Sequence, residues 1–280
     1  MQKLQLRSML QVWLEEDLGS GDITSELLVA GQQVTAIIHA KESGVIAGLE
    51  AAAEVFRLLD PEVQFRCLVS DGEEVQAGAL LAEISGSARA LLSGERLALN
   101  LLQHLSGIAT KTARWQKLLH GTKARLTDTR KTLPGLRQLQ KQAVRLGGGA
   151  NHRMGLFDGV LIKDNHIKIA GGVAKAVRLA KAGAPHTLKV EVEVEDLAGL
   201  DEALSAGADI IMLDNMGDAM MIEAVRLAKG RAILEASGGL SEERLAAVAA
   251  TGVDFISAGA LTHSVQALDI SMDIGTPKSK

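Results

Sequence analysis

Residues 187–215 read TLKVEVEVEDLAGLDEALSAGADIIMLDN, and they set the pattern of the second half of the chain. The segments 187–194 and 209–213 have the composition of strands, and apolar residues recur at helical spacing in 197–206, between them. A strand, a helix and a second strand joined by short loops form a unit in which the two strands lie parallel. This stretch therefore predicts a parallel sheet covered by helices.

The same unit repeats on both sides of this stretch. The last four predicted strands begin 22 or 23 residues apart, which leaves room for one strand, one helix and two loops in each repeat. The predicted strands are 125–129, 159–163, 187–194, 209–213, 232–235 and 254–257. The predicted helices are 136–146, 172–182, 197–206, 219–229 and 242–250. Repeats of this kind build either a barrel or a doubly wound open sheet.

Polar residues at the ends of these strands favour the barrel. They stand at the carboxyl end of each predicted strand, in segments 128–131, 163–166, 193–195, 214–215, 235–237 and 257–259. In a barrel such residues meet on one rim, whereas an open sheet collects its ligands at a single switch point. We therefore expect a barrel with a site at its carboxyl-terminal rim.

The first half of the chain predicts a different, α+β domain. Segments 34–41 and 45–47 look like a hairpin around the turn 42–44, followed by a helix over 49–59. Further antiparallel strands are expected at 63–69 and 80–84, and a long helix, 93–120, leads into the barrel. The polar end of the chain, GTPKSK from Gly275 to Lys280, is expected to be disordered.

Composition limits the class of ligand and the compartment. The formal net charge is -4, yet residues 128–166 hold seven Lys/Arg against three Asp/Glu, which indicates a focused site for a small polyanion. The absence of Tyr, with two Trp and four Phe, argues against nucleic acid. The single Cys67, the lack of a secretory signal and the lack of a membrane-length apolar run predict a soluble cytoplasmic protein.

Alternating residues in 189–195 place Lys189, Glu191, Glu193 and Glu195 on one face of a strand. A solvated edge strand would explain this pattern, but barrel strands are covered on both sides, so the carboxylates would point inward. We expect Lys189 to neutralise one of them. Glu193 and Asp214, near the ends of consecutive strands, are candidate ligands of Mg²⁺.

The glycine-rich segment Gly147–Arg153 delivers the pair His152 and Arg153, which suits a planar carboxylate. Three cationic residues of the helix over 136–146, at i, i+4 and i+8, are instead expected on a solvated face: Arg137, Lys141 and Arg145. The turns 237–239 and 258–260 follow late strands and precede helices, which is where barrels bind phosphate, although ordinary turns would look the same.

Long blocks of the sequence resemble the quinolinate phosphoribosyltransferases, also called nicotinate-nucleotide pyrophosphorylases (carboxylating). The resemblance covers almost the whole chain and is carried by Glu16–Thr24, Gly94–Asn100, Leu105–Thr110, Asp128–Thr132, Gly147–Arg153, Lys163–His166, Leu213–Asn215, Leu234–Gly238 and Gly259–Ser264. It implies an N-terminal α/β sandwich domain over 1–98, with the tail 266–280 packed on it. It also implies a barrel over 99–265 with seven strands, although the residue pattern locates six.

The resemblance further implies a homodimer whose active sites each include Arg96 of the neighbouring chain. The other positions similar to the family's quinolinate-binding residues are Arg130, His152, Arg153, Lys163 and His166. Lys131, Glu193 and Asp214 would be catalytic and would serve phosphoribosyl pyrophosphate, with Glu193 and Asp214 near Mg²⁺. Phosphate would be held at Ser237, Gly238, Ala258 and Gly259.

The implied reaction transfers phosphoribosyl to quinolinate and releases pyrophosphate and CO₂, giving nicotinate mononucleotide for NAD biosynthesis. Two alternatives stay open. One is the paralogue found with molybdate transport, which has a similar fold; the intact segments Asn151–Arg153 and Lys163–His166 argue against it. The other is a catalytically inactive anion-binding protein. The carboxylate-binding residues, the candidate metal ligands and the phosphate turns occur together, which argues against this alternative.

Overall fold

The computed structural model describes residues 3–275, which form two compact units. The first comprises residues 3–111, 133–147 and 264–275 of the described chain, and the second comprises 112–132 and 148–263. The predicted domain boundary, 98/99, and the observed division, 111/112, both fall inside helix α4 (Ala88–Lys117). The predicted disorder of the tail concerns residues that, except for Gly275, lie outside the described range.

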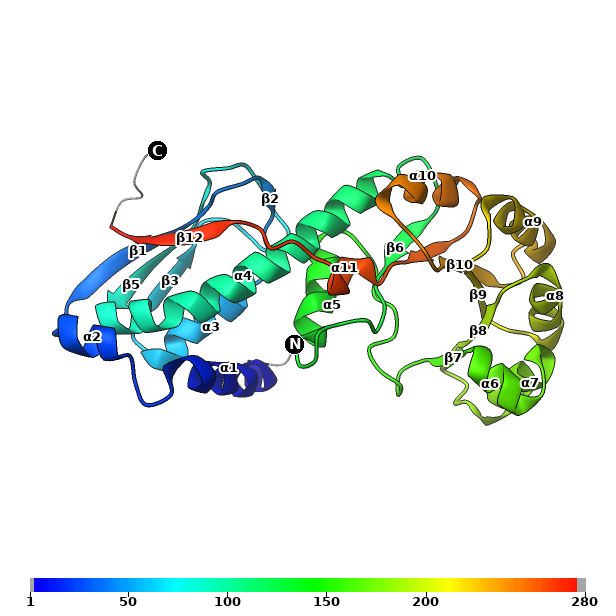
Figure 1. Cartoon of the computed structure of the whole chain (residues 1–280), viewed down its shortest axis with the longest axis horizontal. Coiled ribbons are helices and arrows are strands. Elements are labelled where there is room, and N and C mark those ends of the chain that lie inside the picture. The colour runs from blue at the N-terminus through cyan, green and yellow to red at the C-terminus, as the bar shows by residue number, and fades with distance from the viewer. Residues whose placement is uncertain (1–2, 276–280) are drawn as a thin grey trace. The chain divides into compact units, whose positions relative to one another are not determined.

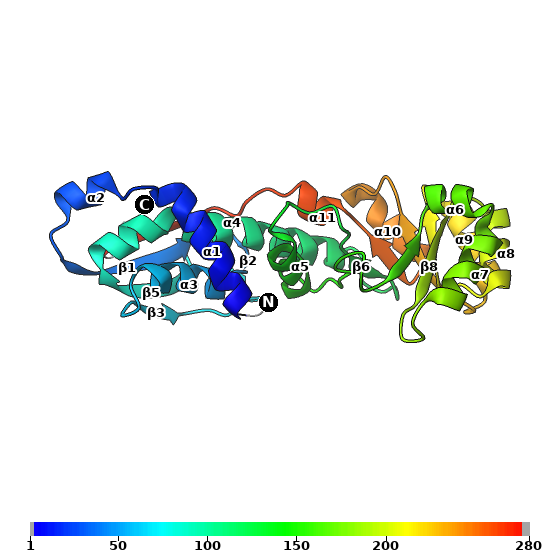
Figure 2. The same ribbon diagram turned by 90° about the horizontal axis from the view of Figure 1, so that it is seen from below.

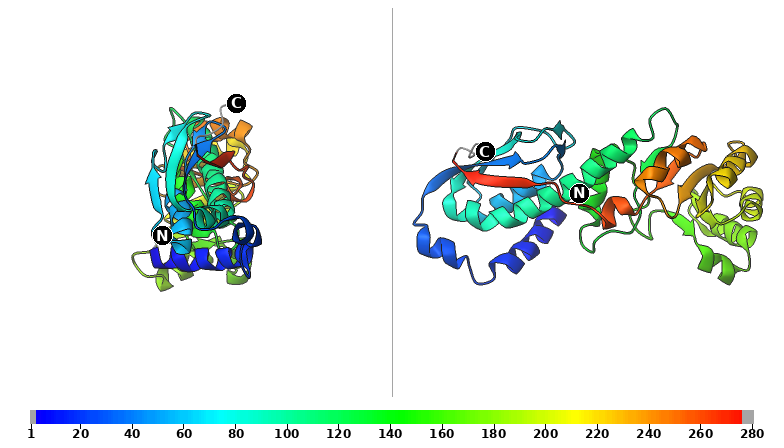
Figure 3. Two further views of the ribbon diagram at one scale, coloured as in Figure 1. Left: turned by 90° about the vertical axis from the view of Figure 1, so that its left-hand side faces the viewer. Right: turned by 45° about the horizontal axis from the view of Figure 1, so that its top comes forward.

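The first unit contains an antiparallel sheet in the order β12-β1-β5-β3. Its strands are β12 (Ile270–Ile274), β1 (Gln33–Ala40), β5 (Leu80–Ser87) and β3 (Gln64–Cys67). Alternate residues of β1, namely Ala36, Ile38 and Ala40, are buried, so one face of the sheet lies against the core. Strand β12, the last element of the described residues, belongs to this unit because it pairs with β1 (Figure 3).

Helices of the first unit are α1 (Lys3–Leu18), α2 (Ile23–Leu28), α3 (Leu49–Leu59), α5 (Arg137–Leu146) and most of α4. Helix α1 packs on α3, whose buried residues include Val55 and Phe56. In α4, Leu91, Leu102 and Leu105 are buried at helical spacing, which explains why this segment folds as a helix despite its many polar residues.

The hairpin predicted around residues 42–44 is wrong. Strand β2 (Gly44–Val45) pairs with β4 (Glu74–Val75), and β1 pairs with β5 and β12 instead. The hydroxyl groups of α4 explain the difference: Thr110 Oγ1 accepts the Val45 N–H at 2.8 Å and Ser106 Oγ accepts the Ala47 N–H at 3.0 Å. Since these amides are satisfied by a helix, the chain after β1 does not fold back along it.

The second unit is built on a parallel sheet of six strands in the order β6-β11-β10-β9-β8-β7. The strands are β6 (Arg125–Thr127), β7 (Val160–Ile162), β8 (Val190–Val194), β9 (Ile210–Asp214), β10 (Ile233–Ser237) and β11 (Phe255–Ser257). All six predicted segments are strands, and the helices lie on the outer side of the sheet (Figures 1 and 2). The predicted barrel-type α/β architecture is confirmed.

A single residue adds to this sheet beyond β6. Ala150 forms an isolated parallel bridge with Thr127, because its N–H donates to Leu126 O at 2.8 Å and its carbonyl accepts the Asp128 N–H at 3.3 Å. The glycines at 147–149 precede it, and glycine does not favour an extended strand. This bridge occupies the place of the seventh strand that the family resemblance implies.

Helices of the second unit are α6 (Asp164–Ala170), α7 (Val173–Gly183), α8 (Leu197–Ala206), α9 (Asp218–Ala228), α10 (Glu242–Ala250) and α11 (Ala260–His263). The bounds of α8 and α10 coincide with the predicted ones. The residue pattern missed α6 and α11 because both are too short to show a helical period. Within residues 3–275, none of the helices has the length and apolar character that crossing a membrane requires.

We expect Gly107→Ala to destabilise the first unit. A Cβ atom at Gly107 would collide with the carbonyl oxygen of Gln266, which belongs to the segment leading into β12. Overpacking of this kind costs about 1–3 kcal/mol, more than alanine gains in helix propensity. The midpoint of urea unfolding should fall for this variant. Gly183→Ala, in helix α7 with open space around it, is the control and should not lower the midpoint; equal midpoints would contradict the packing described.

Candidate active site

A cavity of about 590 Å³ opens at the carboxyl-terminal ends of the parallel strands in the second unit. It contains most of the positions singled out from the sequence. The predicted site residues that line it are Arg130, Lys131, His152, Arg153, Lys163, Glu193, Asp214, Ser237 and Gly238. The cavity is therefore bordered by four Lys or Arg side chains and two carboxylates, as a site for a polyanion and a cation requires.

Arg130 and Arg153 form the cationic part of the wall. Burial lowers the pKa of the Arg153 guanidinium, and the charge of Arg130 lowers it further, whereas Glu191 and Asp158 act in the opposite direction. Arg153 donates from Nη1 to Gly159 O at 3.0 Å, but its buried Nε has no acceptor among the described residues. Two neighbouring guanidinium groups, of which Arg153 has an unused donor, form a ready site for carboxylates.

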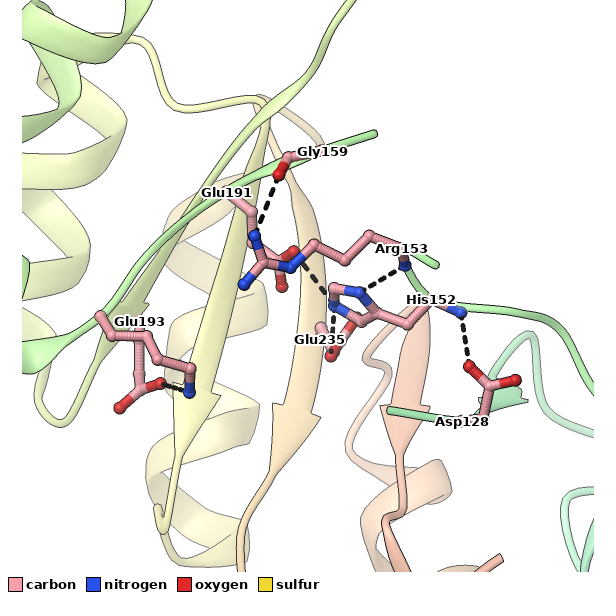
Figure 4. Close-up of polar contacts among 8 residues, drawn as sticks. Asp128, His152, Arg153, Gly159, Glu191, Glu193 and Glu235 are labelled. Carbon is pink, nitrogen blue, oxygen red and sulfur yellow. Dashed lines mark hydrogen bonds and ion pairs between the residues drawn. The ribbon is translucent and has the colours of Figure 1, made fainter. Parts of the chain in front are cut away.

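His152 uses both ring nitrogens within the protein (Figure 4). Its Nδ1 accepts the Arg153 N–H at 2.7 Å, so the ring proton belongs on Nε2, which lies 3.1 Å from Glu191 Oε2. The backbone is held as well, because the His152 N–H donates to Asp128 Oδ1 at 2.9 Å. His152 thus fixes the backbone at Arg153, and because it also lines the cavity, the direct contact with substrate expected from the sequence stays a prediction.

Two buried glutamates lie beneath His152 in the interior of the sheet. Glu191 on β8 and Glu235 on β10 are each 4% exposed, and Glu235 Oε1 lies 3.6 Å from His152 Nε2. Burial raises the pKa of Glu235 to about 7, with a further increase from the nearby Glu191, while His152 lowers it. The alternation in β8 correctly predicted an inward Glu191, whereas Glu235 was marked only as a polar residue at the end of its predicted strand.

Lys163 and Glu193 form an ion pair at the rim. Lys163 Nζ lies 2.9 Å from Glu193 Oε2, whereas Lys189, the residue expected to neutralise this face, is exposed and lies before β8 begins. His166 does not line the cavity; its Nδ1 accepts the Lys163 N–H at 2.9 Å at the start of α6. His166 therefore orients the backbone at Lys163.

The carboxyl ends of β9 and β10 contact each other closely near Asp214 and Gly238. Asn215 has a left-handed backbone with φ of 53°, and it donates its N–H to Ser237 O and its side-chain amide to Asp214 Oδ2 at 2.7 Å. Gly238 has φ of 91°, and a Cβ atom there would collide with Asn215 Oδ1. Only glycine fits at this position, and its lack of a side chain lets the backbone of the turn 237–239 lie close to Asn215.

The turn 258–260 differs from its prediction. The Ala258 N–H donates to Thr127 O at 3.0 Å, so this amide is not available to a phosphate. Gly259 does not line the cavity but supports it, because a Cβ atom there would lie 2.7 Å from Lys131 Cδ. Thr262 Oγ1 donates to Lys131 O at 2.7 Å. These contacts place the Lys131 side chain along Gly259, where it reaches the cavity.

Two further expectations concern the first unit. Arg96 lies on α4 with its side chain 63% exposed, and the nearest carboxylate found is Glu95 at 4.0 Å. The solvated face predicted for α5 is wrong at Lys141, which is completely buried, although Arg145 is exposed. Helix α5 also buries Leu139, Ala143 and Val144, so the helix is covered on more than the apolar side that the sequence marked.

Two family models match the chain, "Quinolinate phosphoribosyl transferase, N-terminal domain" over residues 22–106 and "Quinolinate phosphoribosyl transferase, C-terminal domain" over 108–273. The chain belongs to the quinolinate phosphoribosyltransferase family. Members of this family among the curated relatives include the probable nicotinate-nucleotide pyrophosphorylase (carboxylating) of Bacillus subtilis, 47% identical over 274 residues, which cover 98% of this chain and 95% of the relative. The Mycobacterium leprae enzyme of that name is 49% identical over 270 residues, covering 93% and 94%.

Solved structures of the family agree with the fold. The nicotinate-nucleotide pyrophosphorylase of Francisella tularensis superimposes with a TM-score of 0.94 at 43% sequence identity, and the match covers 98% of each chain. An agreement of this extent includes both units and the six-stranded parallel sheet. It confirms the fold class expected for a quinolinate phosphoribosyltransferase, with its small antiparallel sheet and its larger parallel one.

We expect Gly238→Ala to damage the turn between β10 and α10. Alanine is strained at this φ, and its Cβ would press on Asn215, which together costs about 1–3 kcal/mol. Thermal unfolding should show a lower midpoint and calorimetry a weaker binding of inorganic pyrophosphate. Gly183→Ala, in helix α7 with open space around it, is the control and should behave as wild type. A Gly238→Ala protein that matches this control would show that the turn tolerates a side chain.

Proposed function

We propose that this protein is a quinolinate phosphoribosyltransferase (decarboxylating). It transfers the phosphoribosyl group of phosphoribosyl pyrophosphate to quinolinate and produces nicotinate mononucleotide, pyrophosphate and CO₂, a step of de novo NAD biosynthesis. The relatives that match nearly the whole chain carry names for this activity. The observation that carries the proposal is the composition of the cavity, where adjacent arginines face a rim with two carboxylates and a close-approach glycine turn.

The arginines and Lys163 suit the two carboxylates of quinolinate. Arg130 and Arg153 repel one another in the free protein, so a dianion placed between them relieves that repulsion while it is oriented. With its carboxylates held, the ring nitrogen of quinolinate can face the anomeric carbon of phosphoribosyl pyrophosphate. The nitrogen attacks that carbon as pyrophosphate leaves, and no enzyme nucleophile is required.

Lys131 and the turn at Ser237 and Gly238 serve the departing and the retained phosphates. Lys131 extends along Gly259 into the cavity, where its ammonium group stabilises the negative charge that develops on the leaving oxygen. After transfer the ring nitrogen is a cation. When the adjacent C–CO₂⁻ bond breaks and CO₂ leaves, the electron pair stays on the ring carbon, where the neighbouring positive nitrogen stabilises it; that carbon then takes a proton, which completes nicotinate mononucleotide.

A Mg²⁺ ion fits the donor set of the rim. Glu193 and Asp214 line the cavity with hard oxygen donors, and phosphate oxygens of the substrate would complete the shell that Mg²⁺ prefers. When bound, the ion would neutralise charge on the pyrophosphate group. Lys163 and Asn215, which contact these carboxylates at 2.9 and 2.7 Å, keep them oriented in its absence.

A homodimer with shared sites accounts for Arg96, which is exposed although it lies in a block that resembles the family's quinolinate-binding sequence. We further propose a cytoplasmic location, which agrees with a single free cysteine, Cys67.

A product assay tests the proposal. The protein is incubated with quinolinate, phosphoribosyl pyrophosphate and Mg²⁺, and nicotinate mononucleotide and CO₂ are measured. Both products should form in equal amounts and should be lost when the metal is chelated. Absence of both products with a folded protein would leave the anion-binding alternative. Activity that persists under chelation would remove the metal from the proposal.

Replacing Arg153 with lysine should weaken quinolinate binding although the net charge is unchanged. Lysine lacks the planar fork, and loss of a charge-assisted hydrogen bond costs about 1.5–3 kcal/mol, or roughly 10- to 100-fold in affinity. Arg178→Lys, an exposed position on α7, is the matched control and should bind as wild type. The measurement is the quinolinate dissociation constant from calorimetry. Similar constants for the two variants would show that Arg153 does not hold a carboxylate of quinolinate.

Mixing two inactive variants tests the shared site. Arg96→Ala and Arg153→Ala chains should each be nearly inactive alone. After subunit exchange, about half of the dimers contain both chains, and each of these has one intact site, so about a quarter of wild-type activity should return. Exchange is verified separately with tagged chains. If exchange occurs and activity does not return, Arg96 acts within its own chain or has no role in the site.

A further inference from the structure

We propose that Glu235 takes up a proton when the acidic substrate binds, and that through its contact with His152 it acts as a positioning residue for Arg153. This inference rests on the proposed function, since it concerns the binding of a dianion in the same cavity. Figure 4 shows the Glu191 and Glu235 side chains reaching the His152 ring from different sides, with the Arg153 side chain close to it.

The geometry supplies one N–H group for two carboxylates. His152 Nε2 lies 3.1 Å from Glu191 Oε2 and 3.6 Å from Glu235 Oε1. Glu191 Oε1 and Glu235 Oε1 have no hydrogen-bond partner among the described residues, and both side chains are only 6% exposed. Burial with so few donors disfavours the ionised form of Glu235, so the arrangement is more stable when Glu235 holds a proton.

A proton fits this cluster better than a metal ion. The three side chains bring ligand atoms within 4.8 Å of one another, a spacing that a metal ion could also use. A metal on Nε2, however, would require the ring proton to be on Nδ1, which lies 2.7 Å from the Arg153 N–H, so that two donors would face each other. The contact with Arg153 therefore keeps the proton on Nε2.

The groups around Glu235 determine when it titrates. Glu191 and Asp128 raise its pKa, as does burial, which is the largest effect, whereas His152 and the Ser257 hydroxyl lower it, and the result is a pKa of about 7. On the adjacent strands, the residues paired with Glu235 are Met212 and Phe255, which carry no charge. The carboxyl group is therefore partly protonated in the free protein at neutral pH.

Substrate binding changes the charge on one side of this cluster. Arg153 lines the cavity and interacts electrostatically with both Arg130 and Glu191. A dianion bound to the two arginines offsets their positive charge, which raises the pKa of Glu235 further and draws a proton onto it. Below about pH 6 the group is already protonated in the free protein, so uptake should vanish there; it should be largest above the free pKa of about 7.

A second opening gives this proton a route that avoids the substrate. A separate cavity of about 620 Å³ in the same unit is lined by Glu191, Glu235, Lys189 and Phe255. His152 and Arg153 line both cavities, so the cluster forms part of the wall between them. Water in the second cavity can deliver a proton to Glu235 while quinolinate closes the first.

Calorimetry of quinolinate binding in two buffers of different ionisation enthalpy tests the proposal. At pH 7.5 the wild-type protein should take up roughly 0.3–0.8 proton for each quinolinate bound, and at pH 5.5 almost none. Glu235→Gln, a neutral isostere of the protonated group, should bind quinolinate without proton uptake at either pH. Its affinity should change less than roughly twofold from pH 6.5 to 8.5, while wild-type affinity falls several-fold. A purely structural role would lower affinity without changing the proton count.

Two variants complete the test. Glu195→Gln removes an exposed carboxylate just beyond the same strand as Glu191 and should take up protons as wild type. Glu191→Gln removes the neighbouring charge and should move proton uptake to lower pH, which keeps the proposal testable if Glu235→Gln does not fold. Quinolinate binding without proton uptake, or equal uptake by Glu235→Gln, would overturn this inference alone. A wild-type protein that does not bind quinolinate would overturn the proposed function as well.

Discussion

Polar contacts in the parallel sheet form a continuous series from Asp128, through the backbone and ring of His152, to Glu191 and Glu235. Glu191 and Glu235 point to the inner side of the sheet and are almost fully buried, so their charges are largely removed from water and need a partner. His152 satisfies this requirement on both sides, because its backbone N–H is donated to Asp128 and its ring lies against the glutamates. The position of Arg153 at the cavity wall follows from these contacts.

The cations of the cavity depend on this arrangement. Arg153 meets the charges of Glu191 and Asp158, yet its Nε lacks an acceptor among residues 3–275, and Arg130 stands close enough to lower its pKa. Lys163 is held by Glu193 at the opposite part of the rim. The wall therefore keeps positive charge that the protein does not fully neutralise, and a substrate with two carboxylates supplies what is missing.

The sequence predicted the repeating strands and helices of the second unit and the polar residues at the carboxyl ends of its strands. Strands at 190–194 and 210–214 follow from apolar runs with helical spacing between them, and the inward direction of Glu191 and Glu193 follows from strict alternation. Features set by distant partners were not predictable. Val45 and Ala47 leave the sheet because hydroxyls of α4 bind their amides, and Lys141 is buried because α5 is covered on more than its apolar face. The roles of His152 and His166 depend on single hydrogen bonds to Arg153 and Lys163, which no spacing reveals.

The central claim is that the cavity is built for a dianion. The most direct test is to compare, by calorimetry at one pH and salt concentration, the affinity for quinolinate with that for nicotinate, which lacks the second carboxylate. Loss of one carboxylate removes charge-assisted hydrogen bonds worth about 1.5–3 kcal/mol, so quinolinate should bind roughly 10- to 100-fold more tightly. Equal affinities for the two compounds would contradict the account, because they would show that the paired arginines do not recognise the second carboxylate.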